Sequence, residues 1–208
     1  MSFSKNKFVV IKQVISPELT DFIYKYFLMK RTAAYTLHKN NYFTDKQHYI
    51  ITGSWGDSQV PDAYSHYSDV VMETLLLKVH PIMEKITKLK LYPSYSYARI
   101  YNKGNVLKRH KDRFSCEIST TLNLGGDSWP IYLEPSGKQN MKGVKIDLKP
   151  GDMLIYRGCE LEHWRDKFKG EICSQVFLHY NNKKTKNSKK NLFDGRPHLG
   201  LPKDYKNN

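Results

Sequence analysis

Hydrophobic residues recur with a helical period at two places in the first half of the chain. The first segment begins with Ser16, a side chain suited to capping a helix, and Pro17, which is favoured at the first helical position. Apolar residues then follow at spacings of three and four through residue 31, and again over residues 67–88, where Pro81 predicts a bend. The pattern therefore predicts two amphipathic helices.

From residue 92 onward the period changes to alternation between apolar and polar residues, with frequent turns. The alternating runs, separated by Gly, Pro and polar clusters, are YPSYSYARIY, EISTTLNL, WPIYLEP, GVKIDL, DMLIY and ICSQVFLHY. A short apolar run over residues 7–14 predicts one more strand near the N-terminus. Several short strands with turns between them are typical of an antiparallel sandwich or barrel. The predicted fold class is α+β, with helices packed on a jelly-roll-like core.

A chain of 208 residues predicts one domain that is long enough to bury a core. We expect this domain to span residues 1–181, with supporting helices at about 16–88 and the β-rich core at about 92–181. Residues 182–208 predict a basic, irregular tail. There is no apolar run of membrane-spanning length and no convincing signal peptide. Together with three scattered cysteines, this predicts a cytoplasmic protein with reduced thiols and no membrane partner.

The formal net charge of +14 raises the question of a nucleic-acid partner. Of the 34 basic residues, 27 are Lys, and the abundance of Lys with Asn and Tyr is typical of an AT-rich coding sequence. Eight basic residues and only two acidic ones lie in residues 182–208, so a solvated tail accounts for much of the excess. The charge leaves nucleic-acid binding open without favouring it.

The tyrosine-rich stretch over residues 36–68 is long and polar for a connection between helices. Long connections without periodicity are often lids or binding loops. We therefore expect this stretch to cover the entrance of a substrate site.

His110 and Asp112 stand two residues apart in the run RHKDRFSCE. In a strand, two such side chains point to the same face, where they are either two ligands of one cation or an ordinary surface ion pair. His163 follows about 50 residues later, after a Gly-Asp turn and an apolar strand, and a β-barrel can bring it beside them. Two imidazoles and one carboxylate form a facial triad that leaves positions open on an octahedral iron. A structural zinc site would fill four positions, usually with cysteines, which lack paired spacing here.

Four motifs in order resemble the Fe(II)/2-oxoglutarate-dependent dioxygenase superfamily, and most closely its small prolyl-4-hydroxylase-like branch. They are YNKG at residues 101–104, the His-x-Asp pair, TTLNLGGD after it, and KPGDMLIY before the second histidine. The resemblance covers residues 95–181. It implies a double-stranded β-helix in which His110, Asp112 and His163 bind Fe(II). It also implies that 2-oxoglutarate and O2 are consumed to give succinate, CO2 and a hydroxylated substrate, with ascorbate as a stimulant.

The resemblance also implies residues for the cosubstrate. Tyr101 would hydrogen-bond 2-oxoglutarate through its phenol, although simple packing in the sheet explains a tyrosine there equally well. Thr121 would face the same pocket from the strand after the triad aspartate.

The sequence departs from the family pattern at the residue that pairs with the 5-carboxylate of the cosubstrate. The family usually carries Arg or Lys nine to ten residues after the second histidine, where this chain has Ile172 and Cys173. A buried carboxylate still needs a cation or several donors. Arg165 is the leading substitute, because it shares strand parity with that histidine and its planar fork suits a carboxylate. Arg99 and Lys169 are the next candidates.

The sequence thus predicts a dioxygenase, and most directly a hydroxylase of a peptidyl residue such as proline, acting on a peptide or protein. Leu107 stands where prolyl hydroxylases often have Tyr, which weakens the assignment to proline itself. Two alternatives stay open. One is an oxidative demethylase or hydroxylase of nucleic acid, and the other is a β-barrel module that binds metal without turnover. The sequence does not indicate an oligomeric state.

Overall fold

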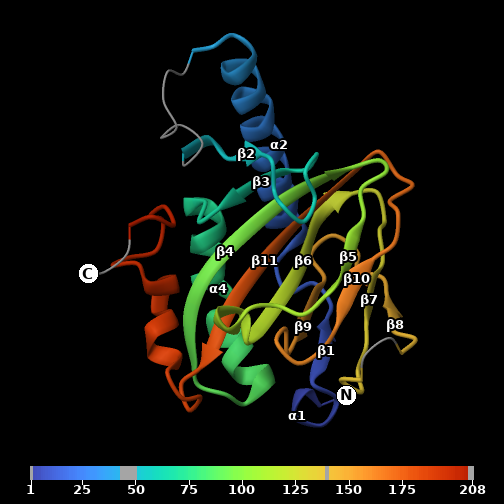
Figure 1. Cartoon of the computed structure of the whole chain (residues 1–208), viewed down its shortest axis with the longest axis vertical. Helices are drawn as coiled ribbons and strands as arrows, with labels where there is room; N and C mark the ends of the chain where they lie inside the picture. The colour runs from blue at the N-terminus through green and yellow to red at the C-terminus, as the bar shows by residue number, and fades with distance from the viewer. Residues whose placement is uncertain (1, 43–50, 139–140, 206–208) are drawn as a thin grey trace.

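The computed structural model describes residues 2–42, 51–138 and 141–205, and its strands form two antiparallel sheets (Figure 1). The larger sheet has the order β1-β9-β6-β11-β4-β3-β2, with bounds β1 (Phe8–Ile11), β2 (Ser54–Trp55), β3 (Tyr64–Tyr67), β4 (Leu91–Asn102), β6 (Ile118–Gly126), β9 (Met153–Tyr156) and β11 (Ile172–Asn182). The smaller sheet has the order β5-β10-β7-β8, with bounds β5 (Leu107–His110), β7 (Ile131–Leu133), β8 (Val144–Ile146) and β10 (His163–Arg165). Together they form a double-stranded β-helix, which confirms the predicted jelly-roll core.

The N-terminal helices support the larger sheet. The described helices are α1 (Phe3–Asn6), α2 (Pro17–Lys39) and α4 (Val70–Thr87), with short 3₁₀ segments η1 (Phe114–Cys116) and η2 (Ser188–Gly195). The Ser16 hydroxyl accepts a hydrogen bond from the Leu19 N–H at 3.2 Å and so caps α2 as predicted. Helix α2 continues beyond the predicted end at residue 31, and α4 continues through Pro81. No helix in the described ranges is long and apolar enough to span a bilayer.

Alternation along β4, β6 and β11 separates an apolar face from a polar one. The residues that join the core beneath the helices include Ala98, Ile100, Leu122, Leu124, Val176 and Leu178. Buried residues at intervening positions carry polar groups: Arg99, Tyr101, Ser119, Thr121, Gln175 and His179. Because side chains alternate across a strand, the polar set lies on the opposite face, inside the β-helix. The interior of the barrel is therefore built for polar chemistry.

The sequence predicts a long loop over residues 36–68, but only part of this stretch is a loop. Its start belongs to α2 and its second half holds β2 and β3, while residues 43–50 lie outside the described part. The β2–β3 connection carries Val60 and Ala63 into a core cluster with Leu107 and Phe168. This apolar anchoring holds the connection against the barrel.

The segment after β11 packs onto the domain instead of being solvated along its length. It lies beside β4 (Figure 1), and the Arg196 guanidinium donates to the Glu73 carboxylate at 2.7 Å. Both side chains of this ion pair are at most 2 % exposed. The Asp194 carboxylate accepts hydrogen bonds from Tyr67 at 2.7 Å and from Arg113 at 2.9 Å. The expectation of a wholly solvated tail is therefore wrong for these residues.

Candidate metal centre and cosubstrate pocket

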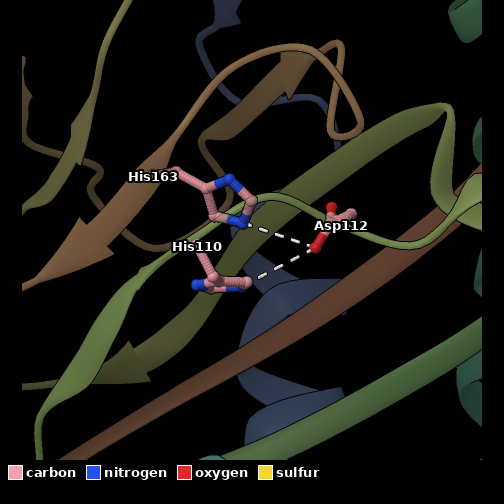
Figure 2. A group of neighbouring side chains, drawn as sticks. All are labelled: His110, Asp112 and His163. Carbon is pink, nitrogen blue, oxygen red and sulfur yellow. Dashed lines mark ion pairs between the residues drawn. The ribbon is translucent and has the colours of Figure 1, made fainter. Parts of the chain in front are cut away.

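Three ligand-bearing side chains meet at one end of the β5–β10 pair, at the edge of the smaller sheet. Strand β5 ends at His110, Asp112 follows in the next loop, and His163 begins β10 directly opposite His110. One ligand atom from each residue lies within 4.8 Å of the others. Figure 2 shows both imidazoles turned toward the carboxylate.

The backbone fixes the same tautomer in both imidazoles. The Nδ1 atom of His110 lies 2.7 Å from the Lys108 carbonyl oxygen, and that of His163 lies 3.1 Å from the Leu161 carbonyl oxygen. A carbonyl only accepts, so each Nδ1 carries the proton and each Nε2 keeps its lone pair. The two Nε2 atoms lie 3.7 and 3.4 Å from the same oxygen, Oδ1 of Asp112.

A tight turn places Asp112. Its backbone N–H donates to the Gly158 carbonyl oxygen at 2.9 Å, and its Oδ2 accepts from the Ser119 hydroxyl at 2.7 Å. A Cβ added at Gly158 would overlap both the carboxylate and this hydroxyl. Only glycine leaves room for the carboxylate here.

The electrostatics of the three groups favour an ionised carboxylate. Burial alone would raise the pKa of Asp112, but the neighbouring His163 and the hydrogen bond from Ser119 hold it well below its ordinary value. Burial, together with the nearby His163 ring, lowers the pKa of His110. For His163, burial is outweighed by the Asp112 carboxylate, which raises its pKa. The Asp112 carboxylate is thus ionised, and a metal would take the place of its contact with His163.

The donor set fits Fe(II). Two imidazole nitrogens and one carboxylate oxygen are the facial triad of non-haem iron oxygenases, with coordination positions left open. Within the described ranges, no other group of three His, Cys, Asp or Glu side chains comes together in this way. The sequence-predicted residues His110, Asp112 and His163 are therefore brought to one point.

A cavity of about 400 Å³ lies beside the triad. Its aromatic lining includes Tyr67, Tyr95, Tyr97, Tyr156 and Phe177. Arg99, Leu107 and His179 also line it, as do Asp57, Ser58 and Gln59 from the β2–β3 connection. Part of the stretch that we expected to cover the site thus forms its wall.

Arg165 lies on β10 with His163 and is 1 % exposed. Its guanidinium donates to the Trp129 carbonyl oxygen, lies 3.4 Å from the Thr121 hydroxyl, and stacks 5.2 Å from the Trp129 ring centroid. Its Nε atom is buried and makes no hydrogen bond to any of the described residues. Within the described part of the chain, no Asp or Glu pairs with this cation. A buried guanidinium without a carboxylate is costly, so its surroundings fit an anionic ligand.

Thr121 and Tyr101 lie near Arg165, but none of these three side chains is among the residues that line the cavity beside the triad. The Thr121 hydroxyl donates to Gln175 Oε1 at 3.0 Å, while the Tyr101 ring contacts Trp129 with centroids 4.8 Å apart. The Tyr101 phenol accepts a hydrogen bond from Arg99 at 3.0 Å. Arg165, Thr121 and Tyr101 therefore lie beside one another.

The other two basic candidates have different surroundings. Arg99 donates to the Asp57 carboxylate at 2.6 Å, in a pair whose side chains are 3 and 8 % exposed. Its charge is already compensated. Lys169 is exposed. Of the three cations considered, Arg165 alone is both buried and without a described carboxylate partner.

Three residues of the site were not predicted from the sequence. Asp57 and Ser119 carry no motif, and a histidine within an alternating strand, such as His179, is most often an ordinary hydrogen-bonded side chain. Parity along β11 was the available signal, since His179 shares its face with Phe177 and Gln175. For Asp57 no sequence signal was available, because its partner lies 42 residues away.

No protein-family model matches the sequence, and no curated protein matches it. Solved structures do match. A prolyl-4-hydroxylase from Pseudomonas putida superposes with a TM-score of 0.63 at 12% identity, covering 87% of this chain and 95% of its own. A prolyl hydroxylase from Trichoplax adhaerens, in complex with a peptide fragment of the hypoxia inducible factor oxygen degradation domain, gives 0.61 at 14% identity over 88% and 86%.

The third match is HygX from Streptomyces hygroscopicus, a structure with nickel, 2-oxoglutarate and hygromycin B bound. It gives a TM-score of 0.59 at 14% identity, covering 88% of this chain and 85% of its own. At these identities the similarity establishes the fold. The chain therefore has the fold of the Fe(II)/2-oxoglutarate-dependent oxygenases, as its four motifs predict.

Proposed function

We propose that the protein is an Fe(II)- and 2-oxoglutarate-dependent dioxygenase that hydroxylates a peptidyl residue, with release of succinate and CO2. The observation that carries this proposal is Arg165, a buried guanidinium without a described carboxylate partner, on the strand that begins with His163. A cosubstrate with two carboxylates can bind the metal at one end and this cation at the other. Residues two apart on a strand face the same side, as this requires.

His110, Asp112 and His163 would hold the metal through Nε2, Oδ1 and Nε2. Bound Fe(II) supplies a Lewis-acidic centre with open positions at which a keto acid and dioxygen react. The Arg165 fork orients the distal carboxylate, and the Thr121 hydroxyl beside it adds a hydrogen-bonding group. The aromatic walls of the cavity surround the metal end of this site.

An extended substrate is supported by a second cavity of about 300 Å³. It shares the lining residues Asp57, Tyr67, Tyr97 and Lys203 with the cavity beside the triad. Adjoining hollows with tyrosine walls suit a chain that inserts one residue and leaves its neighbours outside. The peptide bound to the Trichoplax protein supports the same substrate class, and proline is the first residue to test.

The test is succinate formation from 2-oxoglutarate by protein loaded anaerobically with Fe(II), then exposed to air with ascorbate and a pool of proline-containing peptides. We expect iron-dependent succinate from the wild type and none from His110→Ala. His38→Ala, an exposed residue on α2, is the matched control and should behave as the wild type does.

Two outcomes would separate the parts of the proposal. If no succinate forms and 2-oxoglutarate leaves the visible spectrum of the Fe(II) protein unchanged, the dioxygenase assignment is wrong. If succinate forms equally with and without every peptide, the dioxygenase assignment stands and the peptide substrate is wrong. A nucleic-acid substrate would instead show as turnover stimulated by oligonucleotides.

A further inference from the structure

Ser119 and His179 connect the triad carboxylate to the cavity wall. They are direct partners in the β6–β11 pair. The Ser119 Oγ lies 2.7 Å from Asp112 Oδ2, 2.9 Å from the Cys116 carbonyl oxygen and 3.1 Å from His179 Nδ1. One hydroxyl therefore has three polar neighbours, and its single proton can serve only one of them at a time.

The protons that these groups carry determine the direction of each hydrogen bond. A metal-binding carboxylate is ionised, so Oδ2 of Asp112 needs a donor, and the Ser119 hydroxyl is at hydrogen-bonding distance. With its proton directed to the carboxylate, Ser119 can only accept from His179. The Nδ1 atom of His179 must therefore carry a proton.

The rest of the His179 ring faces the cavity. The side chain is 6 % exposed, lines the cavity beside the triad, and lies against Tyr95 with ring centroids 4.5 Å apart. Its Nε2 makes no hydrogen bond to any described residue, yet it is not among the buried atoms that lack a partner. Burial lowers the pKa of His179 to about 4, so the ring is neutral at pH 7. A neutral ring with Nδ1–H leaves Nε2 as an acceptor.

We propose that Ser119 and His179 are positioning residues, a hydrogen-bonded chain that directs Asp112 Oδ1 toward the metal and presents His179 Nε2 to the cavity as an acceptor. The ligand class that fits this acceptor is a group with an N–H or O–H donor next to the reacting carbon, such as a backbone amide. This inference rests on the proposed function for the identity of the site. It adds to that function the hydrogen-bonding partners behind the metal ligand Asp112, and it predicts a hydrogen-bond donor on the substrate.

The first test measures Mn(II) binding by calorimetry for the wild type and four variants, one of them a control. Loss of a hydrogen-bonding partner behind a metal ligand typically weakens metal binding by about 10- to 100-fold, which we expect for Ser119→Ala. Asn places a donor where Nδ1 stands and Gln places an amide where Nε2 stands. His179→Asn should therefore weaken Mn(II) binding less than His179→Gln does. Ser96→Ala, which removes a fully buried hydroxyl without a partner, is the control.

The second test reads the tautomer of His179 from its imidazole ¹⁵N resonances in the Zn(II)-loaded protein. We expect a protonated Nδ1 and an unprotonated Nε2. A protonated Nε2, or a Ser119→Ala variant that binds Mn(II) as tightly as the wild type, overturns the inference alone. If the wild type itself binds no Mn(II), the metal site and hence the proposed function are wrong as well.

Discussion

His163 lies directly opposite His110 in the β5–β10 pair, and their ring centroids are 4.2 Å apart. Cross-strand partners in an antiparallel pair hold their side chains close together, so the sheet itself delivers two of the three ligands. The third ligand has no such support, because Asp112 stands beyond the end of β5. Its position depends on the turn that contains Gly158.

Gly158→Ala should weaken metal binding and destabilise the fold. The new methyl group would overlap the Asp112 carboxylate and the Ser119 hydroxyl. The overlap can be relieved only if the Asp112 carboxylate, a metal ligand, shifts. Overpacking of this kind costs about 1–3 kcal/mol. Calorimetry with Mn(II) and urea unfolding measure the two effects. Cys159→Ser, in the same turn, adds no atom and keeps a donor for the Arg113 carbonyl oxygen, so it should change neither. Unaltered Mn(II) affinity in Gly158→Ala would show that the turn has room after all.

Arg165→Leu should abolish the response to 2-oxoglutarate while preserving the fold. Removing one partner of a buried, hydrogen-bonded charge pair costs at least about 2 kcal/mol, or about 30-fold in affinity. Without the cosubstrate the variant loses only an unpaired buried cation, so its unfolding temperature should not fall sharply. Thermal unfolding with and without 2-oxoglutarate, in the Mn(II)-loaded protein, measures both effects.

Arg165→Lys is the matched variant, since it keeps the charge and loses the planar fork. We expect it to bind 2-oxoglutarate more weakly than the wild type and more tightly than Arg165→Leu. Wild-type affinity in Arg165→Leu would show that another cation pairs with the cosubstrate, and Arg99 would then be the first to test.

The long strands could be predicted from the sequence because their pattern is strong. Strands β4, β6 and β11 each run for nine residues or more and alternate regularly. Strand β3 was missed because it is only four residues long and its sequence YSHY does not alternate between apolar and polar residues. A short strand with a polar, fully covered sequence resembles a loop.

The residues of the candidate site likewise comprise some that the sequence could predict and some that it could not. His110, Asp112, His163 and Arg165 were accessible to sequence reasoning because each pair is linked by local spacing or a motif. The Asp57–Arg99 and Ser119–His179 pairs join residues 42 and 60 positions apart. Only the register of the sheet and the course of the β2–β3 connection bring them together, and neither can be predicted from a local sequence pattern.

Asp57→Asn should destabilise the protein by about 3 kcal/mol, because it leaves the Arg99 guanidinium buried without its counter-charge. The Oδ1 atom of Asp57 accepts hydrogen bonds from the backbone of Gln59 and Val60, and the amide oxygen of Asn can still accept them, so the variant separates the charge from the turn. Urea unfolding measures the loss. The double variant Asp57→Asn, Arg99→Met removes both charges and should recover part of the stability. An equal or larger loss in the double variant would show that the ion pair is not the cause.

Acid should destabilise the protein partly through Asp69, which caps α4 and is completely buried. Burial alone would raise its pKa, but hydrogen bonds from His66, Lys30 and Tyr26 hold it well below the ordinary value of 3.8. A carboxyl group whose pKa is lower in the folded state contributes stability above its unfolded pKa. That contribution is lost as the pH falls below about 4 toward the folded pKa.

Asp69→Asn should therefore flatten the acid limb of the stability curve, by about 2 kcal/mol between pH 7 and pH 2. The amide oxygen can still cap α4, so the variant separates the charge from the cap. Urea unfolding at pH 7, 4, 3 and 2 gives the curve. Asp21→Asn, in an exposed pair with Lys25, should leave it unchanged. If Asp69→Asn is as acid-sensitive as the wild type, other carboxylates set the acid limb, and Asp57 with its lowered pKa is the next to replace.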